Sequence, residues 1–179
     1  MFPMIIATWN CNMAFRKKAS HMMNIKPDIL VVQECEHPDR LTFESPFSEP
    51  LHKLWFGDNQ TKGLGIFAYS DFRLELHNSY DANHRYIVPI KVSGAVDFNL
   101  LAVWAMDDKL NRRNRYVGQV WNAVNHYSHI GDKTVIAGDF NSNAIWDNES
   151  SLRSGNNFFY IAKPTGHTTS TTVSFQRNL

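Results

Sequence analysis

The sequence predicts an α/β fold whose short, buried strands end in polar residues. Three observations predict it: apolar β-branched runs of strand length, a strand–helix–strand order near the N-terminus, and an amphipathic stretch of helical period in the second half. The chain has 179 residues, enough for one domain with a sizeable core. Hydrophobic residues make up 43% and charged residues 20%, which is typical of a folded globular chain rather than a disordered one.

The first part of the chain is expected to combine strands with one short helix. Residues 4–9 and 29–33 are predicted to be strands, and residues 15–24 a helix between them. This order indicates two parallel neighbouring strands joined by a crossover. Residues 53–57 are predicted to form a further strand, and residues 62–69 a turn followed by a strand.

The second part of the chain is expected to hold three more strands and the longest helix. Alternating apolar residues predict a strand over 85–92, and an apolar run predicts another over 97–104. A helix is predicted over 111–130, because its large apolar residues recur at helical spacing. The run at 134–138 predicts the last strand of this part.

A group of arginines lies at the start of the predicted long helix: Arg112, Arg113 and Arg115. Cations at this end oppose the helix dipole. One interpretation is a patch that faces phosphate groups, and the other, slightly favoured, is an exposed and solvated turn. The formal net charge is only +1, so contact with a nucleic acid has to depend on local patches of this kind.

Oxygen-rich side chains follow three of the predicted strands. Asn10 and Asn12 follow the first, Glu34 follows the second, and Asp139 and Asn141 follow the strand at 134–138. Strands that end on the same side of an open sheet bring such residues together. Hard oxygen ligands suit a divalent cation such as Mg²⁺, so the pattern predicts phosphate chemistry.

Each of these residues has a candidate role. Asn10 either coordinates a metal through its amide oxygen or holds a neighbouring ligand, and Glu34 needs a cation or hydrogen bonds because burial disfavours its charge. Asp139 can orient or deprotonate a water molecule, Asn141 can donate to a phosphoryl oxygen, and Asn12 is a candidate phosphate contact.

Each role also has a plainer alternative. Asp and Asn readily form Asx turns after a strand, and Glu34 could pair with a lysine or arginine. Three such endings after three apolar runs nevertheless favour one shared site over three unrelated turns.

The motifs Thr8-Trp9-Asn10-x-Asn12, Gln33-Glu34 and Gly138-Asp139-Phe140-Asn141-Ser142 resemble those of the endonuclease/exonuclease/phosphatase superfamily in order and spacing. The resemblance implies that residues 1–147 form a four-layer α/β sandwich, with two packed mixed sheets flanked by helices. It also implies hydrolysis of a phosphoester by water with Mg²⁺, or with Mn²⁺ as an alternative. In that pattern Asn10 and Glu34 hold the metal, whereas Asp139 and Asn141 position the attacking water and stabilise the phosphoryl transition state.

Residues 148–179 depart from the family pattern. Family members often carry His where Trp104 stands, and they finish with an Ile-Asp-Tyr-like strand and a Ser-Asp-His motif that this chain lacks. Codons for residues 167–174, read in a shifted frame, can encode Tyr-His-Ile-Asp-Tyr-Cys-Phe, which matches the missing strand. We therefore expect an atypical, out-of-frame tail, with the last strands missing or altered and a sheet edge exposed. The coding DNA decides this point.

These features predict a metal-dependent phosphodiesterase, with an endonuclease-like activity favoured. A nucleic acid is the expected substrate, contacted by Asn12, Arg112 and Arg115, and a small phosphoester is the alternative substrate. A different hypothesis is a catalytically impaired remnant that binds metal or phosphate without turnover, since the terminal Asp and His motifs are absent. A third is a general α/β binding domain whose strand-end residues only form turns.

The two cysteines, Cys11 and Cys35, bear on the compartment of the protein. They are too few for a disulfide scaffold, and no histidine stands at the spacing of a zinc site beside them. The N-terminus has no basic start, and no run approaches the length of a membrane span. We expect a cytoplasmic protein that does not bind membranes.

Overall fold

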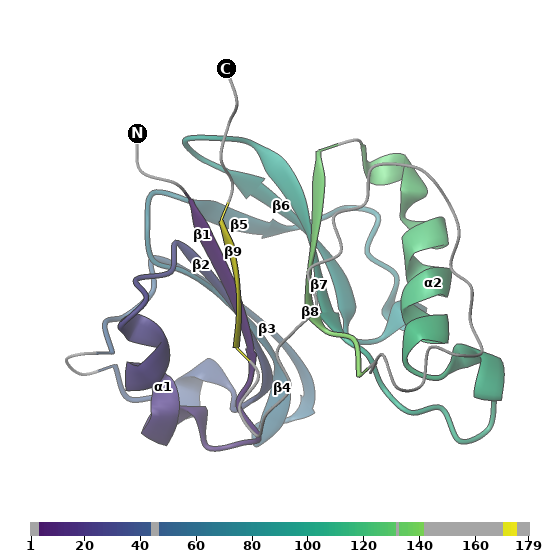
Figure 1. The fold of residues 1–179 in the computed structure, drawn as a ribbon, viewed down its shortest axis with the longest axis horizontal. Helices are drawn as coiled ribbons and strands as arrows, with labels where there is room; N and C mark the ends of the chain where they lie inside the picture. The colour runs from purple at the N-terminus through teal and green to yellow at the C-terminus, as the bar shows by residue number, and fades with distance from the viewer. Residues whose placement is uncertain (1–3, 44–46, 132, 142–169, 175–179) are drawn as a thin grey trace.

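Two β-sheets form the centre of the molecule in a computed structural model that describes residues 4–43, 47–131, 133–141 and 170–174 (Figure 1). The first sheet contains β1 (Ile5–Asn10), β2 (Ile29–Cys35), β3 (His52–Asn59), β4 (Lys62–Ala68) and β9 (Ser170–Ser174), in the order β3-β4-β2-β1-β9. The second contains β5 (Arg73–Leu76), β6 (Ile87–Ser93), β7 (Phe98–Trp104) and β8 (Thr134–Asp139), in the order β5-β6-β7-β8.

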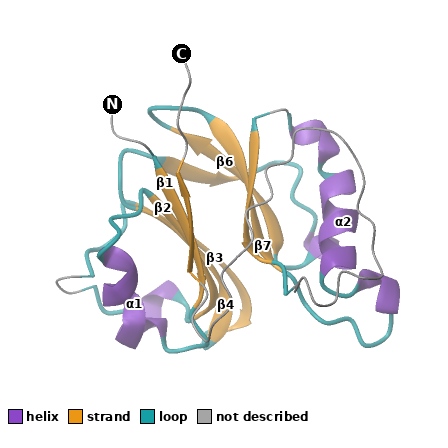
Figure 2. Ribbon diagram, viewed as in Figure 1, coloured by secondary structure: helices purple, strands orange, loops and turns teal. Residues whose placement is uncertain are grey.

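The two α-helices of the described residues lie on opposite outer sides of these sheets (Figure 2). Helix α1 (Phe15–Met23) lies against the first sheet, and α2 (Val117–His126) lies against the second. The succession of helix, sheet, sheet and helix confirms the predicted four-layer α/β sandwich. Within the described part of the chain, neither helix has the length and apolar composition of a membrane span.

The central strands β2 and β7 are largely apolar because both of their faces are covered. In β2, Val31 lies in the core between the sheets, whereas Val32 packs in the cluster that includes α1. In β7, Leu100 lies in the core between the sheets, whereas Leu101 packs with α2. Adjacent residues of a strand point to opposite faces, so a doubly covered strand needs apolar residues at consecutive positions.

The long helix is shorter than predicted. Helix α2 begins at Val117, after a 3₁₀ turn η3 (Arg112–Asn114), and a second 3₁₀ turn follows it. Tyr116 has a φ of 48°, outside the range of a right-handed helix, so the helix does not extend further toward the N-terminus. The arginines expected in the first helical turn therefore precede the helix.

Part of the tail forms strand β9, which pairs with the first sheet. It pairs antiparallel with β1, from Trp9 opposite Ser170 to Ile5 opposite Ser174. Strand β1 therefore has a neighbour on both sides, and the exposed edge expected there is covered by backbone pairing with residues 170–174. Residues 148–169 lie outside the described part of the chain, and the out-of-frame origin of the tail stays a prediction.

Candidate active site at the strand ends

The carboxyl ends of three strands from both sheets converge. Strands β1 and β2 are parallel, with Asn10 opposite Gln33, and β7 and β8 are parallel, with Trp104 opposite Asp139. Strand β8 contacts β1 and β2 across the two sheets. The ends that carry Asn10, Glu34 and Asp139 therefore meet where the sheets approach each other.

The side chain of Asn10 joins two carboxylates. Its amide nitrogen donates to Asp139 Oδ2 at 2.8 Å and lies 3.5 Å from Glu34 Oε1. Its amide oxygen accepts from the backbone N–H of Asn12 at 3.0 Å. The nitrogen of Asn10, rather than its oxygen, thus faces the carboxylates. This orientation fits the alternative in which Asn10 holds a neighbouring ligand.

Glu34 is held at a β-bulge and is partly buried. The pairing of β2 with β4 shifts register between Gln33 and Cys35, and Glu34 has a φ of 60°. Its side chain is 18% exposed, and Lys62 Nζ lies 3.3 Å from Glu34 Oε2. The same ammonium lies 5.2 Å from the centre of the Trp104 ring. The sequence predicted a lysine or arginine partner for Glu34 as the alternative to a metal. The structure identifies this partner as Lys62, which the sequence alone did not indicate.

The neighbouring residue Gln33 fixes the end of β2 from inside the protein. Its side chain is fully buried and donates to Thr8 Oγ1 at 3.0 Å and to the carbonyl of Val103 at 3.2 Å. These bonds connect β2 with β1 in its own sheet and with β7 in the other. Such buried and satisfied amides fix relative positions, because a shift would leave polar groups unpaired.

Asp139 and Asn141 form a turn whose side chains also reach the other strands. Asp139 Oδ1 accepts from the backbone N–H of Asn141 at 2.9 Å, which is the Asx turn considered as the plainer alternative. The Asn141 amide donates to the carbonyl of Ala105 at 2.7 Å. The turn therefore exists, and it places both oxygens of Asp139 in hydrogen bonds next to Glu34.

The candidate substrate-binding residues lie at the periphery of this group. Asn12 is exposed and follows Asn10 in a turn of its own, with a φ of 48°. Arg112 is exposed in η3, and the guanidinium of Arg115 is paired with Asp107, which raises the pKa of Arg115. Within the described ranges, no hydrogen bond or ion pair joins either arginine to Asn10, Glu34 or Asp139.

A cysteine also lies beside the site. The thiol of Cys11 donates to the carbonyl of Glu34 at 3.3 Å, and both Cys11 and Cys35 are free and buried. Burial raises the pKa of Cys11 to about 12, and burial also raises the pKa of Cys35. A thiol with a raised pKa stays protonated near neutral pH, which argues against either cysteine as a thiolate nucleophile.

Comparison with family models gives one match that spans nearly the whole chain. The model described as the endonuclease/exonuclease/phosphatase family matches residues 7–177. No curated protein sequence matches the chain.

Comparison with solved structures gives the same fold. A truncated TDP2 from Caenorhabditis elegans superposes with a TM-score of 0.56 and 19% identity, over 79% of this chain and 64% of that one. A humanized TDP2 from D. rerio superposes with a TM-score of 0.53 and 16% identity, over 79% of this chain and 63% of that one. The chain therefore spans less than two thirds of the length of these structures.

Proposed function

The chain belongs to the endonuclease/exonuclease/phosphatase family, and from this membership we propose a divalent-metal-dependent phosphodiesterase with nucleic acid as its substrate. The observation that carries the proposal is the Asn10 amide, which joins Glu34 of one sheet to Asp139 of the other. Two carboxylates that lie against one amide in a partly exposed position are suited to a hard cation and a phosphate.

The donor set fits Mg²⁺, and Mn²⁺ is an alternative. Magnesium in enzymes is commonly bound by one or two carboxylates, with water and substrate phosphate as the other ligands. Glu34 would hold the cation, and Asn10 would orient Asp139 and Glu34 toward the same point. When bound, the cation supplies a positive charge that stabilises negative charge on the phosphoryl oxygens.

The remaining chemistry is assigned to residues of the chain. Asp139 orients a water molecule and accepts its proton, while the bond from that oxygen to phosphorus forms. The ester P–O bond breaks, and the leaving oxygen takes a proton from solvent. One N–H of the Asn141 amide donates to Ala105, and the amide carries a second N–H that we assign to a phosphoryl oxygen. Lys62, beside Glu34, adds a positive charge to the site.

The proposal is tested by incubating the full chain with supercoiled plasmid DNA. Nicking in the presence of Mg²⁺ or Mn²⁺ that stops when EDTA is added supports it, and cleavage that persists in EDTA overturns the metal dependence.

The Lys62–Glu34 ion pair is compatible with one competing function, because the ammonium weakens the attraction of Glu34 for a catalytic cation. In that case the chain is a remnant that binds metal or phosphate without turnover. Magnesium binding measured by calorimetry, combined with no cleavage of DNA or of a small phosphodiester, would establish it.

A nucleic-acid substrate predicts a specific role for the exposed arginines before α2. Replacing Arg112 and Arg113 together by Ala should raise the KM for DNA by about 10-fold. The KM should also depend less on salt concentration, because binding with fewer phosphate contacts releases fewer counterions. The kcat should change little. Steady-state cleavage measured at several salt concentrations checks this.

The control for this experiment is Arg40→Ala, which removes another exposed arginine in the 3₁₀ turn η1 (Pro38–Arg40). Hydrolysis of bis(p-nitrophenyl) phosphate provides a second control, because this small diester cannot reach a distant patch. Equal loss on DNA and on the small diester would contradict a role in binding nucleic acid.

A further inference from the structure

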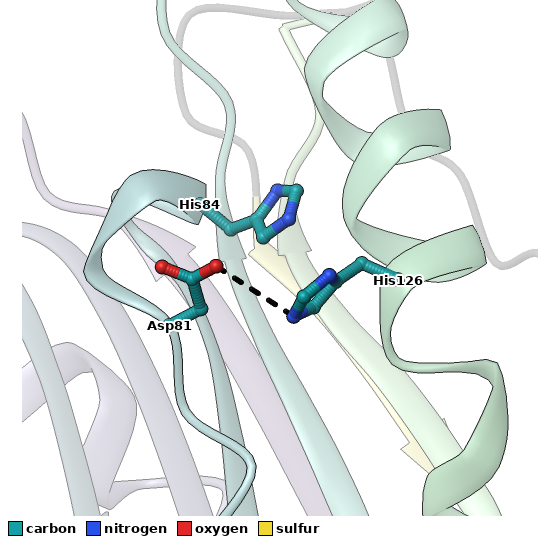
Figure 3. Close-up of side chains that lie close together, drawn as sticks. All are labelled: Asp81, His84 and His126. Atoms are coloured by element: carbon teal, nitrogen blue, oxygen red, sulfur yellow. Dashed lines mark ion pairs between the residues drawn. The ribbon is translucent and has the colours of Figure 1, made fainter.

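A cluster of metal-ligating side chains lies outside the site described above. Asp81 and His84 belong to the segment around the 3₁₀ turn η2 (Ala82–His84), and His126 is the last residue of α2 (Figure 3). Each offers one ligand atom, and these atoms lie within 4.8 Å of one another. His126 Nε2 lies 3.7 Å from Asp81 Oδ2, and the two imidazole rings are 4.4 Å apart at their centres.

The backbone holds the first two of these residues in place. Asp81 Oδ1 accepts from the N–H of Asn83 at 2.9 Å, and the N–H of His84 donates to the carbonyl of Asp81 at 3.0 Å. This leaves Asp81 Oδ2 directed toward His126. The carboxylate is therefore positioned by the turn itself and does not depend on a ligand.

Tyr127 holds the same segment against the end of α2. Its side chain is buried, and its hydroxyl accepts from the backbone N–H of Asp81 at 3.1 Å. The rings of His84 and His126 both contact the Tyr127 ring edge-on, at 5.5 and 4.9 Å between centres. Two imidazoles and a carboxylate thus converge on one point from two elements that are far apart in the sequence.

We propose that Asp81, His84 and His126 bind a divalent transition-metal ion, with Zn²⁺ the best fit. Two imidazole nitrogens and one carboxylate oxygen form a ligand set typical of zinc, whereas Mg²⁺ and Ca²⁺ prefer oxygen ligands alone. Three protein ligands leave at least one coordination position for water, and His126 is exposed to solvent.

The geometry requires a modest closure around the ion. Zinc bonds of about 2.0–2.1 Å place tetrahedral ligand atoms about 3.4 Å apart, which is shorter than the widest separation in this cluster. His126 can close that gap by a side-chain rotation, because it stands exposed in the last turn of α2. The bound ion would connect the segment before β6 to the end of α2.

The test uses the full chain, treated with EDTA, dialysed, and titrated with ZnCl₂ by calorimetry. We expect one zinc ion bound at this cluster, and His126→Ala should weaken it by at least about 10-fold, since loss of an outer-sphere partner alone has that effect. The matched control is His21→Ala, which removes an exposed histidine in the last turn of α1 and should leave binding unchanged.

A second comparison separates this cluster from the proposed phosphodiesterase site. Glu34→Gln should bind zinc with the affinity of the unmodified chain, whereas His126→Ala should bind it more weakly, because Glu34 takes no part in the cluster. Zinc should also raise the Tm of the unmodified chain and of His21→Ala by more than it raises that of His126→Ala. If His126→Ala proves unfolded without metal, His84→Gln takes its place in both measurements.

Either of two results overturns the proposal. One is that the unmodified chain binds no zinc, and the other is that the cluster variant binds it with the same affinity and stoichiometry. In both cases Asp81 and His126 form an ion pair only. These results leave the DNA-cleavage test untouched, so failure of the zinc site and failure of the proposed phosphodiesterase are distinguishable.

Discussion

Asp139→Asn should lower the kcat of metal-dependent cleavage by about 100-fold or more. The substitution keeps the shape of the side chain but removes its charge and its ability to accept a proton. It also disturbs the hydrogen bonds of both carboxylate oxygens, since Oδ2 accepts from the Asn10 amide and Oδ1 accepts from the N–H of Asn141. An amide nitrogen in either position would face a donor. Steady-state plasmid cleavage in Mg²⁺ measures the effect.

The matched control for this variant is Asp71→Asn, which neutralises an exposed carboxylate away from the strand ends. Its cleavage rate should equal that of the unmodified chain. Circular dichroism should show that both variants are folded. If Asp139→Asn cleaves DNA at the unmodified rate, the residue is not the proton acceptor, and the assignment of the site is wrong.

Gly138→Ala should destabilise the fold by about 3 kcal/mol or more, the range for large steric and backbone effects. A Cβ atom at this position would lie 1.9 Å from the carbonyl oxygen of Val103, and Gly138 has a φ of 154°. The sequence motif places a glycine before Asp139, and the structure shows that it allows close approach of the neighbouring strand β7. The residue therefore sets the spacing of β7 and β8 at the end that carries Asp139.

The control is Gly131→Ala, where φ is 111° but the nearest atom to an added Cβ is Asn99 Nδ2 at 3.9 Å. This variant has the backbone strain without the steric clash, so it should lower the free energy of unfolding by only about 1–3 kcal/mol. Urea unfolding of both variants at one pH separates the two effects. Equal free energies of unfolding would show that the approach of Val103 is relieved at little cost.

The layers of the fold could be predicted because their signals are local. The apolar runs in β1, β2 and β8 predict strands with two covered faces. The polar residues that follow these runs predict a site at the common edge where the strands end. The meeting of Asn10 with Glu34 and Asp139 follows from that topology. Strand β5 gave no such signal, since Leu74 is its single buried residue.

Features that depend on contacts between distant segments could not be predicted. The start of α2 is set by Tyr116, whose backbone N–H donates to the carbonyl of Met106. The partnership of Lys62 with Glu34 depends on the register of β2 and β4, where Gly63 lies opposite Cys35. A register of this kind is decided by long-range packing rather than by the neighbouring residues.

The histidine cluster was also missed, although part of it is visible in the sequence. Asp81 and His84 stand three residues apart, a spacing too common to indicate a metal site alone. Their partner His126 comes from α2, and only the packing of that helix on the second sheet brings it near.

The ammonium of Lys62 beside Glu34 has a consequence for which ions the site accepts. The Lys62 ammonium, with a charge of one unit, already lies next to the Glu34 carboxylate. An incoming cation must therefore displace this ammonium or attract the carboxylate more strongly. Sodium or potassium brings no more charge than the lysine, and every incoming ion must give up part of its hydration shell. A doubly charged ion gains about twice the Coulomb attraction at the same distance. We therefore expect a divalent cation to compete with Lys62 for Glu34 more strongly than sodium or potassium does.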